Sequence, residues 1–319
     1  MNRYLYIIFF LLASRIPLFS QPAPAAEENI PYLITFGGNA ETTWGDDDFC
    51  QIFFCVIPSS QTDPVYIRIF DPDTGGDLDE LKAGFNTVVN FSIYTGDGCW
   101  SDTSAQSIYL SGNFRSGYLA SSKSFGSDPK YNNKWYSFGP FNPFEGENVD
   151  KLGGRVLKII AQGISGDDGN IYKYFLSTSP SENIPVEGGN FFTYKYHFRL
   201  SDDQKHVCQI YPFVDEEAIS IEISNFDWDN DGIIRIFSVA KNGYLCDVSG
   251  EDNWVVRKFP IVSEEKNSTI EIQFIKNQFE QIRNNNVVVA VRNQYGIALP
   301  FYVIPIGGIP VYSPKIRMR

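Results

Sequence analysis

The sequence has little of what enzymes use for nucleophilic, metal-dependent or phosphate chemistry. It contains only two histidines, His197 and His206, among 319 residues. It has no H-E-x-x-H motif and no glycine-rich loop followed by lysine, and residues 163–167 (G-I-S-G-D) lack the last glycine of a nucleophile elbow. We therefore expect no catalytic residues and no enzyme, although 38 acidic residues leave room for a glycosidase-type carboxylate pair.

Long apolar runs are also missing, apart from a short one at the amino terminus. Arg3 precedes an apolar segment at residues 4–13, which is followed by Pro17 and by small residues up to Ala25. This is the order of a secretory signal peptide, with cleavage after Ser20 or Ala25. The apolar segment is too short for a membrane span, which takes about 20 residues. We expect a signal peptide over residues 1–25 and a protein exported to the periplasm, the cell surface or the medium, not an integral membrane protein.

Basic side chains are scarce. The formal net charge is −12, and loss of the signal peptide leaves 24 basic side chains against 38 acidic ones, which is a charge of −14. A chain this acidic is repelled by phosphate backbones, so nucleic acid is excluded as a partner. The basic tail, residues 307–319, is expected to be a solvated end. A glycan or a protein at the cell surface or in the periplasm is the compatible partner.

Helical periodicity is missing, and alternation with a period of two is found instead. Apolar residues alternate with polar ones at 65–70, 219–223 and 270–274, and the longest alternating run covers residues 192–200. Such alternation predicts half-buried antiparallel strands. We expect an all-β protein made of two tandem antiparallel sandwiches of jelly-roll or Greek-key type, with minimal helix.

The expectation of two domains comes from an internal repeat. The shared landmarks, in order, are C-Q-I at 50–52 and 208–210, an acidic turn at 71–76 and 227–232, F-S at 91–92 and 237–238, and a cysteine at Cys99 and Cys246. The first domain is expected over residues 30–178, and the second over residues 189–306. The small and proline-rich segment 179–188 is the expected linker.

Five cysteines in an exported chain predict disulfides. The repeat suggests the pairs Cys50–Cys99 and Cys208–Cys246, one in each domain. Cys55 would be left over, and Cys55–Cys99 is an alternative pair because Cys50 and Cys55 point to opposite faces of a strand. Free buried thiols are the other alternative.

The first domain has a long insert at about residues 100–152 that is rich in aromatic side chains. Loops of this composition on a β scaffold are where binding usually occurs. We therefore take Trp100, Tyr131, Trp135 and Tyr136 as candidate ligand-binding residues. The alternative is a hairpin whose aromatic rings pack on its own sheet.

The acidic turns are candidate calcium sites. Asp227, Asp229 and Asp231 precede a glycine with the D-x-D-x-D-G spacing of a calcium loop, and the first domain has Asp71, Asp73 and Asp77 at the matching turn. Neither turn has a glutamate at the twelfth position. Further ligands would come from other loops, such as residues 46–48 or 167–168. The alternative is a set of β-turns held by side-chain hydrogen bonds, without metal.

The segments 219–223, 227–238 and 287–291, with weaker counterparts at 65–73, 91–94 and 156–161, resemble bacterial pre-peptidase C-terminal domains. The resemblance implies secreted β-sandwich modules that often bind calcium and have an accessory or adhesive role. We expect a secreted non-catalytic binding or adhesion protein with Ca²⁺ as cofactor. The alternatives are a carbohydrate-binding protein that stacks exposed tryptophan and tyrosine on sugar rings, and a secreted hydrolase.

Overall fold

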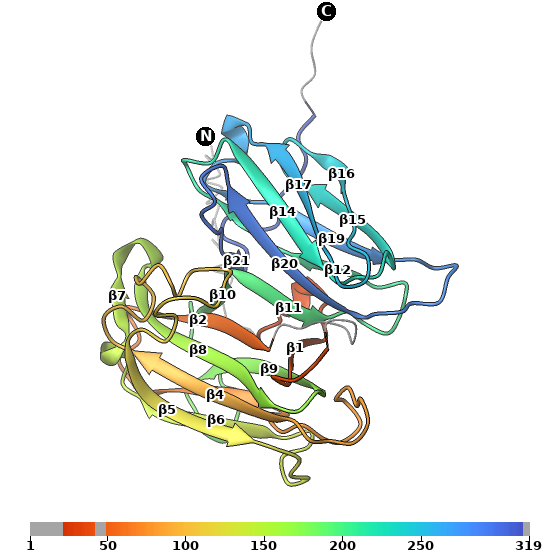
Figure 1. The fold of residues 1–319 in the computed structure, drawn as a ribbon. Coiled ribbons are helices and arrows are strands. Elements are labelled where there is room, and N and C mark those ends of the chain that lie inside the picture. Colours follow the sequence, from red (N-terminus) through yellow and green to blue (C-terminus); the bar gives the residue numbers. More distant parts are fainter. Residues whose placement is uncertain (1–21, 42–48, 315–319) are drawn as a thin grey trace, which may run out of the picture.

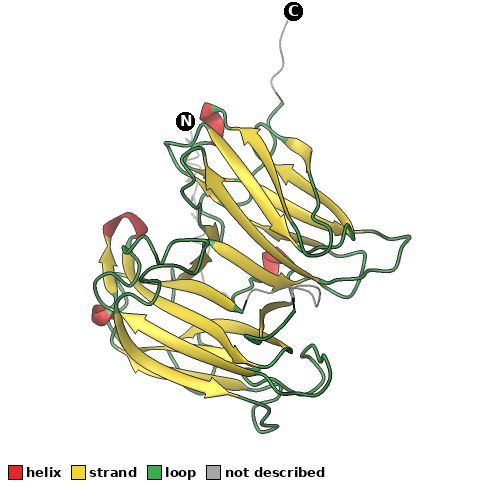
Figure 2. Ribbon diagram, viewed as in Figure 1, coloured by secondary structure: helices red, strands yellow, loops and turns green. Residues whose placement is uncertain are grey.

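The computed structural model describes residues 22–41 and 49–314, which form two β-sandwich lobes (Figures 1 and 2). The strands are β1 (Tyr32–Phe36), β2 (Cys50–Pro58), β3 (Val65–Phe70), β4 (Val88–Thr95), β5 (Tyr118–Phe125), β6 (Trp135–Phe141), β7 (Glu147–Val149), β8 (Gly154–Ser165), β9 (Gly169–Ser177), β10 (Asn190–Thr193), β11 (Lys195–Arg199), β12 (Val207–Ile210), β13 (Phe213–Val214), β14 (Ser220–Phe226), β15 (Gly232–Phe237), β16 (Asn242–Cys246), β17 (Trp254–Pro260), β18 (Ser268–Thr269), β19 (Glu271–Lys276), β20 (Asn286–Asn293) and β21 (Phe301–Tyr302).

Helical structure in the described ranges is confined to single 3-10 turns. These turns are η1 (Ala26–Glu28), η3 (Pro143–Glu145), η4 (Asp150–Leu152) and η5 (Ser263–Glu265). None of the helices within residues 22–41 and 49–314 is long and apolar enough to cross a membrane. All paired strands run antiparallel. The prediction of an all-β, sandwich-type fold is confirmed.

The two lobes have the same strand order. In the lower lobe of Figure 1, one layer is β1-β9-β3-β6 and the other is β10-β2-β8-β4-β5. In the upper lobe, the layers are β11-β20-β14-β17 and β12-β19-β15-β16. Each strand of these two upper layers therefore has a counterpart in the lower lobe, β12 matching β2, for example, and β15 matching β4, whereas β13 and β18 form a separate pair. The expected insert contains β5 and β6, the counterparts of β16 and β17, so only the loop at 96–117 is additional.

The lobes are joined through a shared sheet. β1 pairs with β11, so the layers β1-β9-β3-β6 and β11-β20-β14-β17 form one sheet of eight strands. The alternating run at 192–200 is split at Tyr194: β10 pairs with β2, whereas β11 pairs with β1 and β20. The chain thus changes sheets within one residue. A single apolar core runs through both lobes, from Phe53 and Phe91 to Trp228 and Phe274.

The amino-terminal segment is packed between the lobes. Ala23 exchanges two backbone hydrogen bonds with Tyr174 of the lower lobe, at 2.9 and 2.8 Å. The fully buried Glu28 accepts hydrogen bonds from the Ala25 amide at 2.7 Å and from the Tyr196 hydroxyl at 3.0 Å. Tyr211 of the upper lobe donates to the carbonyl oxygen of Glu27 at 3.1 Å. Residues 23–28 therefore help to hold the two lobes together.

The predicted disulfides are wrong, because all five cysteines are free thiols. Cys50 lies opposite Gln162 on β8, whereas the Cys99 thiol donates to the carbonyl oxygen of Val156, six residues further along the same strand. At about 3.3 Å per residue, roughly 20 Å separates the two. The alternative pair fails as well, because Cys55 faces the sandwich interior and Cys99 packs against the other face of the sheet.

The cysteines of the second lobe are also too far apart to pair. Cys208 is on β12 and Cys246 is on β16, and two strands, β19 and β15, lie between them. The residues paired across these four strands are Cys208, Phe274, Ile234 and Cys246. Three strand spacings of about 4.8 Å therefore separate Cys208 from Cys246, about 14 Å in all. A disulfide needs α-carbons within about 7 Å. The repeat aligned Cys99 with Cys246, but the first is in a loop after β4 and the second is at the end of a strand.

A first prediction concerns these thiols. Burial raises the pKa of Cys55, and it raises the pKa of Cys99 and of Cys246 to about 12, so these thiols stay protonated and unreactive in the folded protein. Protein unfolded without reductant should therefore yield all five thiols to a colorimetric reagent. Reductant should leave the melting temperature unchanged. A count below five, or a lower melting temperature with reductant, would contradict the structure.

A second prediction concerns Glu28. Burial raises the pKa of its carboxyl from 4.5 to about 8, so the folded protein keeps a proton that the unfolded chain releases near pH 4.5. The free energy of unfolding should fall as the pH rises from about 4.5 to about 8, by up to about 1.4 kcal/mol per pH unit. Glu28→Gln should flatten this part of the stability profile, because an amide stays neutral while its oxygen accepts from the Ala25 amide and its Nε2 donates to the Tyr196 hydroxyl. The matched control is Glu27→Gln, which changes an exposed neighbour. If the stability of wild type and of Glu28→Gln falls equally with pH, Glu28 does not hold a proton in the folded protein.

Candidate functional site

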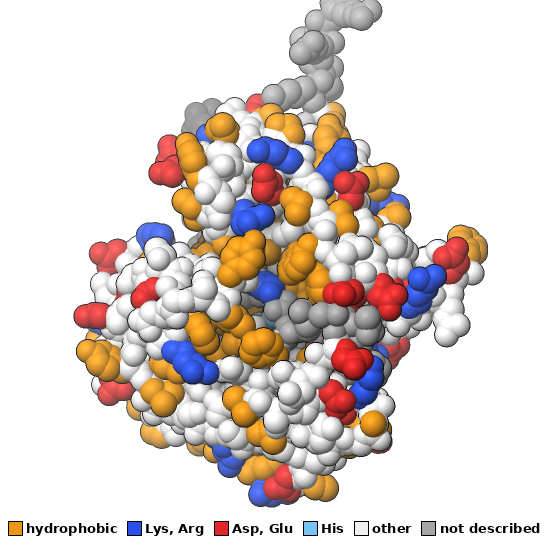
Figure 3. Space-filling view, viewed as in Figure 1, with side chains coloured by type: hydrophobic (Ala, Val, Ile, Leu, Met, Phe, Trp, Pro, Cys, Tyr) orange, Lys and Arg blue, Asp and Glu red, His pale blue; other side chains and the backbone are white. Residues whose placement is uncertain are grey.

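A cavity of about 570 Å³ lies at the junction of the two lobes. Residues from both lobes line it: Val56, Trp100, Gln106, Lys151, Leu152, Gly188, Asn190, Tyr194, Phe213, Asp215, Ile297, Ala298, Leu299, Pro300, Tyr302 and Ile306. Figure 3 shows one face of the molecule, on which hydrophobic side chains gather along the waist between the lobes. The volume is within the range of about 300 to 1,000 Å³ that is typical of small-molecule sites, and such sites favour domain junctions.

The shared architecture brings the aromatic wall of this cavity together. β21, which comes from the carboxyl-terminal part of the chain, adds to the first lobe's sheet and places Tyr302 opposite Phe192 on β10. The Tyr302 ring lies 5.2 Å from Phe192 and 6.1 Å from Phe213, measured between centroids. Tyr194 follows directly at the point where the chain changes sheets. Three aromatic side chains from distant segments, Tyr194, Phe213 and Tyr302, thus face one space.

Trp100 forms part of the same wall and is fixed on three sides. Its indole Nε1 donates to the Tyr194 hydroxyl at 3.2 Å, and its backbone amide donates to Glu147 Oε2 at 2.6 Å. The Lys151 ammonium lies 4.4 Å from the centre of the indole ring, which is a cation–π distance. Because these contacts hold the ring from its edge, its backbone and one face, Trp100 is a rigid element of the site.

Two buried charges hold the loop that carries Trp100. Burial alone would raise the pKa of Glu147, but the hydroxyl and amide of Ser101 and the amide of Trp100 hold it below its usual range. Lys158 donates to the carbonyl oxygens of Phe114 and Ser116, each at 2.7 Å. Burial lowers the pKa of Lys158 to about 8. The loop at 96–117 is therefore tied to β7 and β8 at both ends.

The lining predicts an uncharged ligand with an apolar face and a polar edge. The aromatic and aliphatic side chains outnumber the polar ones, which are Gln106, Lys151, Asn190 and Asp215. Lys151 is already engaged with Trp100, and the Asn190 side chain bonds the backbone of Ile304 at 3.0 and 3.1 Å. A cluster of like charges, which a strongly ionic ligand would need, is not among the residues that line the cavity.

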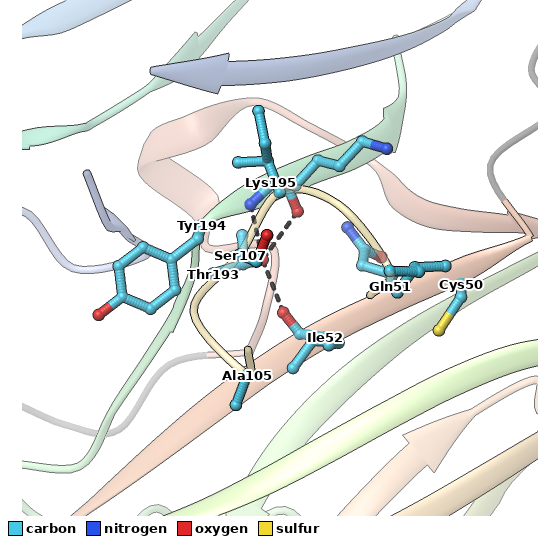
Figure 4. Close-up of a pocket in the computed structure, with 10 residues that line it drawn as sticks. Cys50, Gln51, Ile52, Ala105, Ser107, Thr193, Tyr194 and Lys195 are labelled. Carbon is cyan, nitrogen blue, oxygen red and sulfur yellow. Dashed lines mark hydrogen bonds between the residues drawn. The ribbon is translucent and has the colours of Figure 1, made fainter. Parts of the chain in front are cut away.

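A second, smaller cavity lies where the loop at 96–117 packs on the strands of the first lobe. It has a volume of about 20 Å³, enough for one water molecule, and it lies between residues 105–110 and the strands β2, β10 and β11. Figure 4 shows the Thr193 hydroxyl at its centre, bonded to the carbonyl oxygens of Ile52 and Lys195 at 2.7 Å each. This cavity is too small for a ligand, and its polar contacts stabilise the change of sheets at Tyr194.

The other candidate aromatic residues lie away from Trp100. Tyr131 and Tyr136 pack with Phe125 at the β5 and β6 edge of the first lobe, with ring centroids 5.1 to 5.9 Å apart, and Lys123 lies 4.6 Å from the Tyr136 ring. Trp135 packs on Phe70 and Arg68. For these three residues the structure shows the hairpin packing that the sequence left open as the alternative.

The first aspartate of each acidic turn holds a neighbouring hairpin loop. Asp71 and Asp227 both adopt a positive φ, of 54° and 53°. Asp71 Oδ1 accepts from the amide of Asn133 at 2.8 Å, and Asp227 Oδ1 accepts from the amide of Asp252 at 2.7 Å. The two acceptors occupy equivalent places in the two lobes. The role of this position is to fix the turn against the loop that joins β5 to β6 or β16 to β17.

The other acids of the turns differ between the lobes. Asp231 Oδ2 accepts from the amides of Arg283 and Asn284, whereas Asp77 is exposed. In the described part of the chain, no three His, Cys, Asp or Glu side chains converge closely enough to hold a metal ion. Asp168, a candidate extra ligand, instead accepts from the amides of Lys82, Asn86 and Thr87. Of the remaining candidates, Asp167 has one buried oxygen without a hydrogen-bond partner, and residues 46–48 lie outside the described residues.

Sequence reasoning missed most of the cavity. Of its aromatic wall the sequence indicates only Trp100 as a candidate, because Tyr194 lies within an alternating strand pattern and neither Phe213 nor Tyr302 belongs to a motif. No local signal marks them, because their meeting depends on β21 joining the sheet of the other lobe. The proline- and glycine-containing stretch at 296–300 was the one local sign of a loop at this edge. The chain matches no protein-family model and no curated protein.

Proposed function

We propose that this chain is an exported, non-catalytic binding protein whose ligand occupies the cavity between the two lobes. The observation that carries the proposal is the aromatic wall formed by Trp100, Tyr194, Phe213 and Tyr302, which is held rigid by buried charges and by the shared sheet. A rigid wall reduces the entropy that binding costs. The resemblance of residues 227–238 to pre-peptidase C-terminal modules supports an adhesive or accessory role.

The proposed ligand is a neutral glycan segment. A sugar ring has an apolar face that stacks on aromatic rings and a rim of hydroxyl groups that bond amides and carboxylates. The cavity offers both kinds of partner, with Phe213 and Tyr302 on one side and Gln106 and Asp215 as polar groups. The acidic charge of the chain opposes polyanionic glycans, so neutral ones fit better.

A third prediction tests the location of the ligand. Ala298 is half-buried and lines the cavity, so Ala298→Trp should fill it without removing an existing contact. Neutral glycans that bind the wild type on an array should bind this variant at least about tenfold more weakly in calorimetry. Trp135→Ala is the matched control, because it removes an aromatic ring outside the cavity.

The outcomes separate the class of ligand from its location. Equal binding by wild type and Ala298→Trp would place the ligand elsewhere on the protein. Loss of binding in Trp135→Ala with retention in Ala298→Trp would move the site to the β5 and β6 edge. If no neutral glycan binds the wild type, the glycan proposal is wrong.

A fourth prediction concerns export. Ala23 and Ala25 are buried and hydrogen-bonded to Tyr174 and Glu28, so cleavage after Ala25 would remove part of the contact between the lobes. We therefore propose cleavage after Ser20, and sequencing of the exported protein should find Gln21 as its first residue. A chain that begins at Ala26 should be less stable than one that begins at Gln21, by at least about 2 kcal/mol, because it loses these backbone hydrogen bonds. A mature protein that begins at Ala26 with undiminished stability would contradict this assignment.

A further inference from the structure

The turn after β3 contains a carboxylate that is buried without a partner. Asp73 is completely buried, and neither of its carboxylate oxygens has a hydrogen-bond partner. Its own amide and that of Asp128 face it without meeting hydrogen-bond geometry, and burial raises its pKa to about 6. Burying an ionised carboxylate without compensation is costly, and buried charges are normally paired or bound to metal ions.

Two amide oxygens near this turn are in the same situation. Asn170 is fully buried, and its Nδ2 donates to the carbonyl oxygens of Pro72 and Asp73 at 3.2 and 2.8 Å. Its Oδ1 has no hydrogen-bond partner, and neither has the buried Oδ1 of Asn132 in the loop between β5 and β6. Asn170 therefore lies against the turn with one oxygen left to accept.

The glycine of the turn shows where the oxygens of Asp73 and Asn132 meet. A Cβ atom on Gly75 would lie 3.7 Å from Asp73 Oδ2 and 3.8 Å from Asn132 Oδ1. Both oxygens therefore face the space beside Gly75, which a side chain would fill. The Ser127 hydroxyl oxygen faces the same space, 3.0 Å from that Cβ position.

The surrounding charge is negative. Burial and the charges of Asp71 and Asp73 raise the pKa of Asp79 to about 8, and the charge of Asp128 adds to the effect of burial on Asp73. Both oxygens of Asp79 already accept from backbone amides, those of Ile171 and Gly75 at 2.7 and 2.6 Å. The nearby cation Lys130 is exposed and pairs with Asp128 at 2.6 Å. The unpartnered oxygens thus lie in a field that attracts a positive ion.

We propose that Asp73 and Asn132 bind one divalent cation of the calcium type beside Gly75. Both groups offer oxygen, which hard cations prefer, whereas structural zinc sites favour sulfur and nitrogen. Calcium accepts a mixture of carboxylate and carbonyl oxygens in irregular geometry, and magnesium requires a near-ideal octahedron. The ligand set combines Asp73 with an asparagine of another loop, so it differs from the three aspartates that the D-x-D spacing suggested.

The second lobe does not repeat this arrangement. Its corresponding residue, Asp229, has one oxygen without a hydrogen-bond partner, but its side chain is half-exposed and lines an open pocket with Glu280, Gln281 and Arg283. Burial and the charges of Asp231 and Glu251 raise the pKa of Asp229, and the positive charge of Arg283 opposes this shift. Because an arginine already lines this pocket, one ion per chain is expected.

A fifth prediction tests this site with the full mature chain, freed of metal by chelator and dialysis. Calcium at about 5 mM, above the usual dissociation constants of extracellular modules, should raise the melting temperature, and calorimetry should find one ion per chain. Magnesium should have a much smaller effect. Asp73→Asn should abolish the calcium response, and Asn132→Ala, in a partly exposed loop, should weaken binding by at least about tenfold. The matched control is Asp227→Asn in the second turn, which should keep the response.

A melt without calcium shows whether Asp73→Asn loses the calcium response only because it is less stable. Without calcium, Asp73→Asn should melt no lower than the wild type, because it removes a buried charge. No calcium response in the wild type would overturn the proposal. A response that survives Asp73→Asn but is lost in Asp227→Asn would overturn it as well, and would place the ion at the second turn.

Discussion

The pairing of β1 with β11 is the interaction on which the rest of this structure depends. It converts two sandwich layers into one eight-stranded sheet and forces the chain to change sheets at Tyr194. Because β10 then belongs to the first lobe, β21 can add to the same edge and bring Tyr302 across the junction. The cavity exists only because these strands cross between the lobes. A linker between independent domains would not create it, since free domains reorient relative to each other.

The fold class could be read from the sequence because it depends on local alternation. Runs such as Val65–Phe70 and Glu271–Lys276 have the period of two that burial on one face imposes, and both form strands. The run at 192–200 shows where this reasoning stops. Its alternation is unbroken, yet Tyr194 separates strands of two sheets. The choice of partner strand is a long-range property, and pattern within one strand does not encode it.

The cysteines and the aspartates show why a repeat predicts some positions and not others. Asp71 and Asp227 have the same φ and the same kind of acceptor role, because each completes a turn whose geometry the fold repeats. Cys99 and Cys246 have no such shared role. They match only as landmarks in order along the chain, and the additional loop at 96–117 moves Cys99 out of the sheet. Equivalence in sequence order becomes equivalence in space only where the backbone path is the same.

The buried ionisable side chains of this protein share one role, which is to fix loops and segments between strands. Glu147 and Lys158 hold the loop of Trp100, and Glu28 holds the segment between the lobes. Each of these groups has hydrogen-bond partners that compensate for its burial, which is the usual condition for keeping a polar group inside. The carboxylate oxygens of Asp73 have none among the described residues, and the proposed cation would supply the missing partner. A cation beside Gly75 would compensate the buried carboxylate of Asp73, just as the carbonyl oxygens of Phe114 and Ser116 compensate the buried ammonium of Lys158.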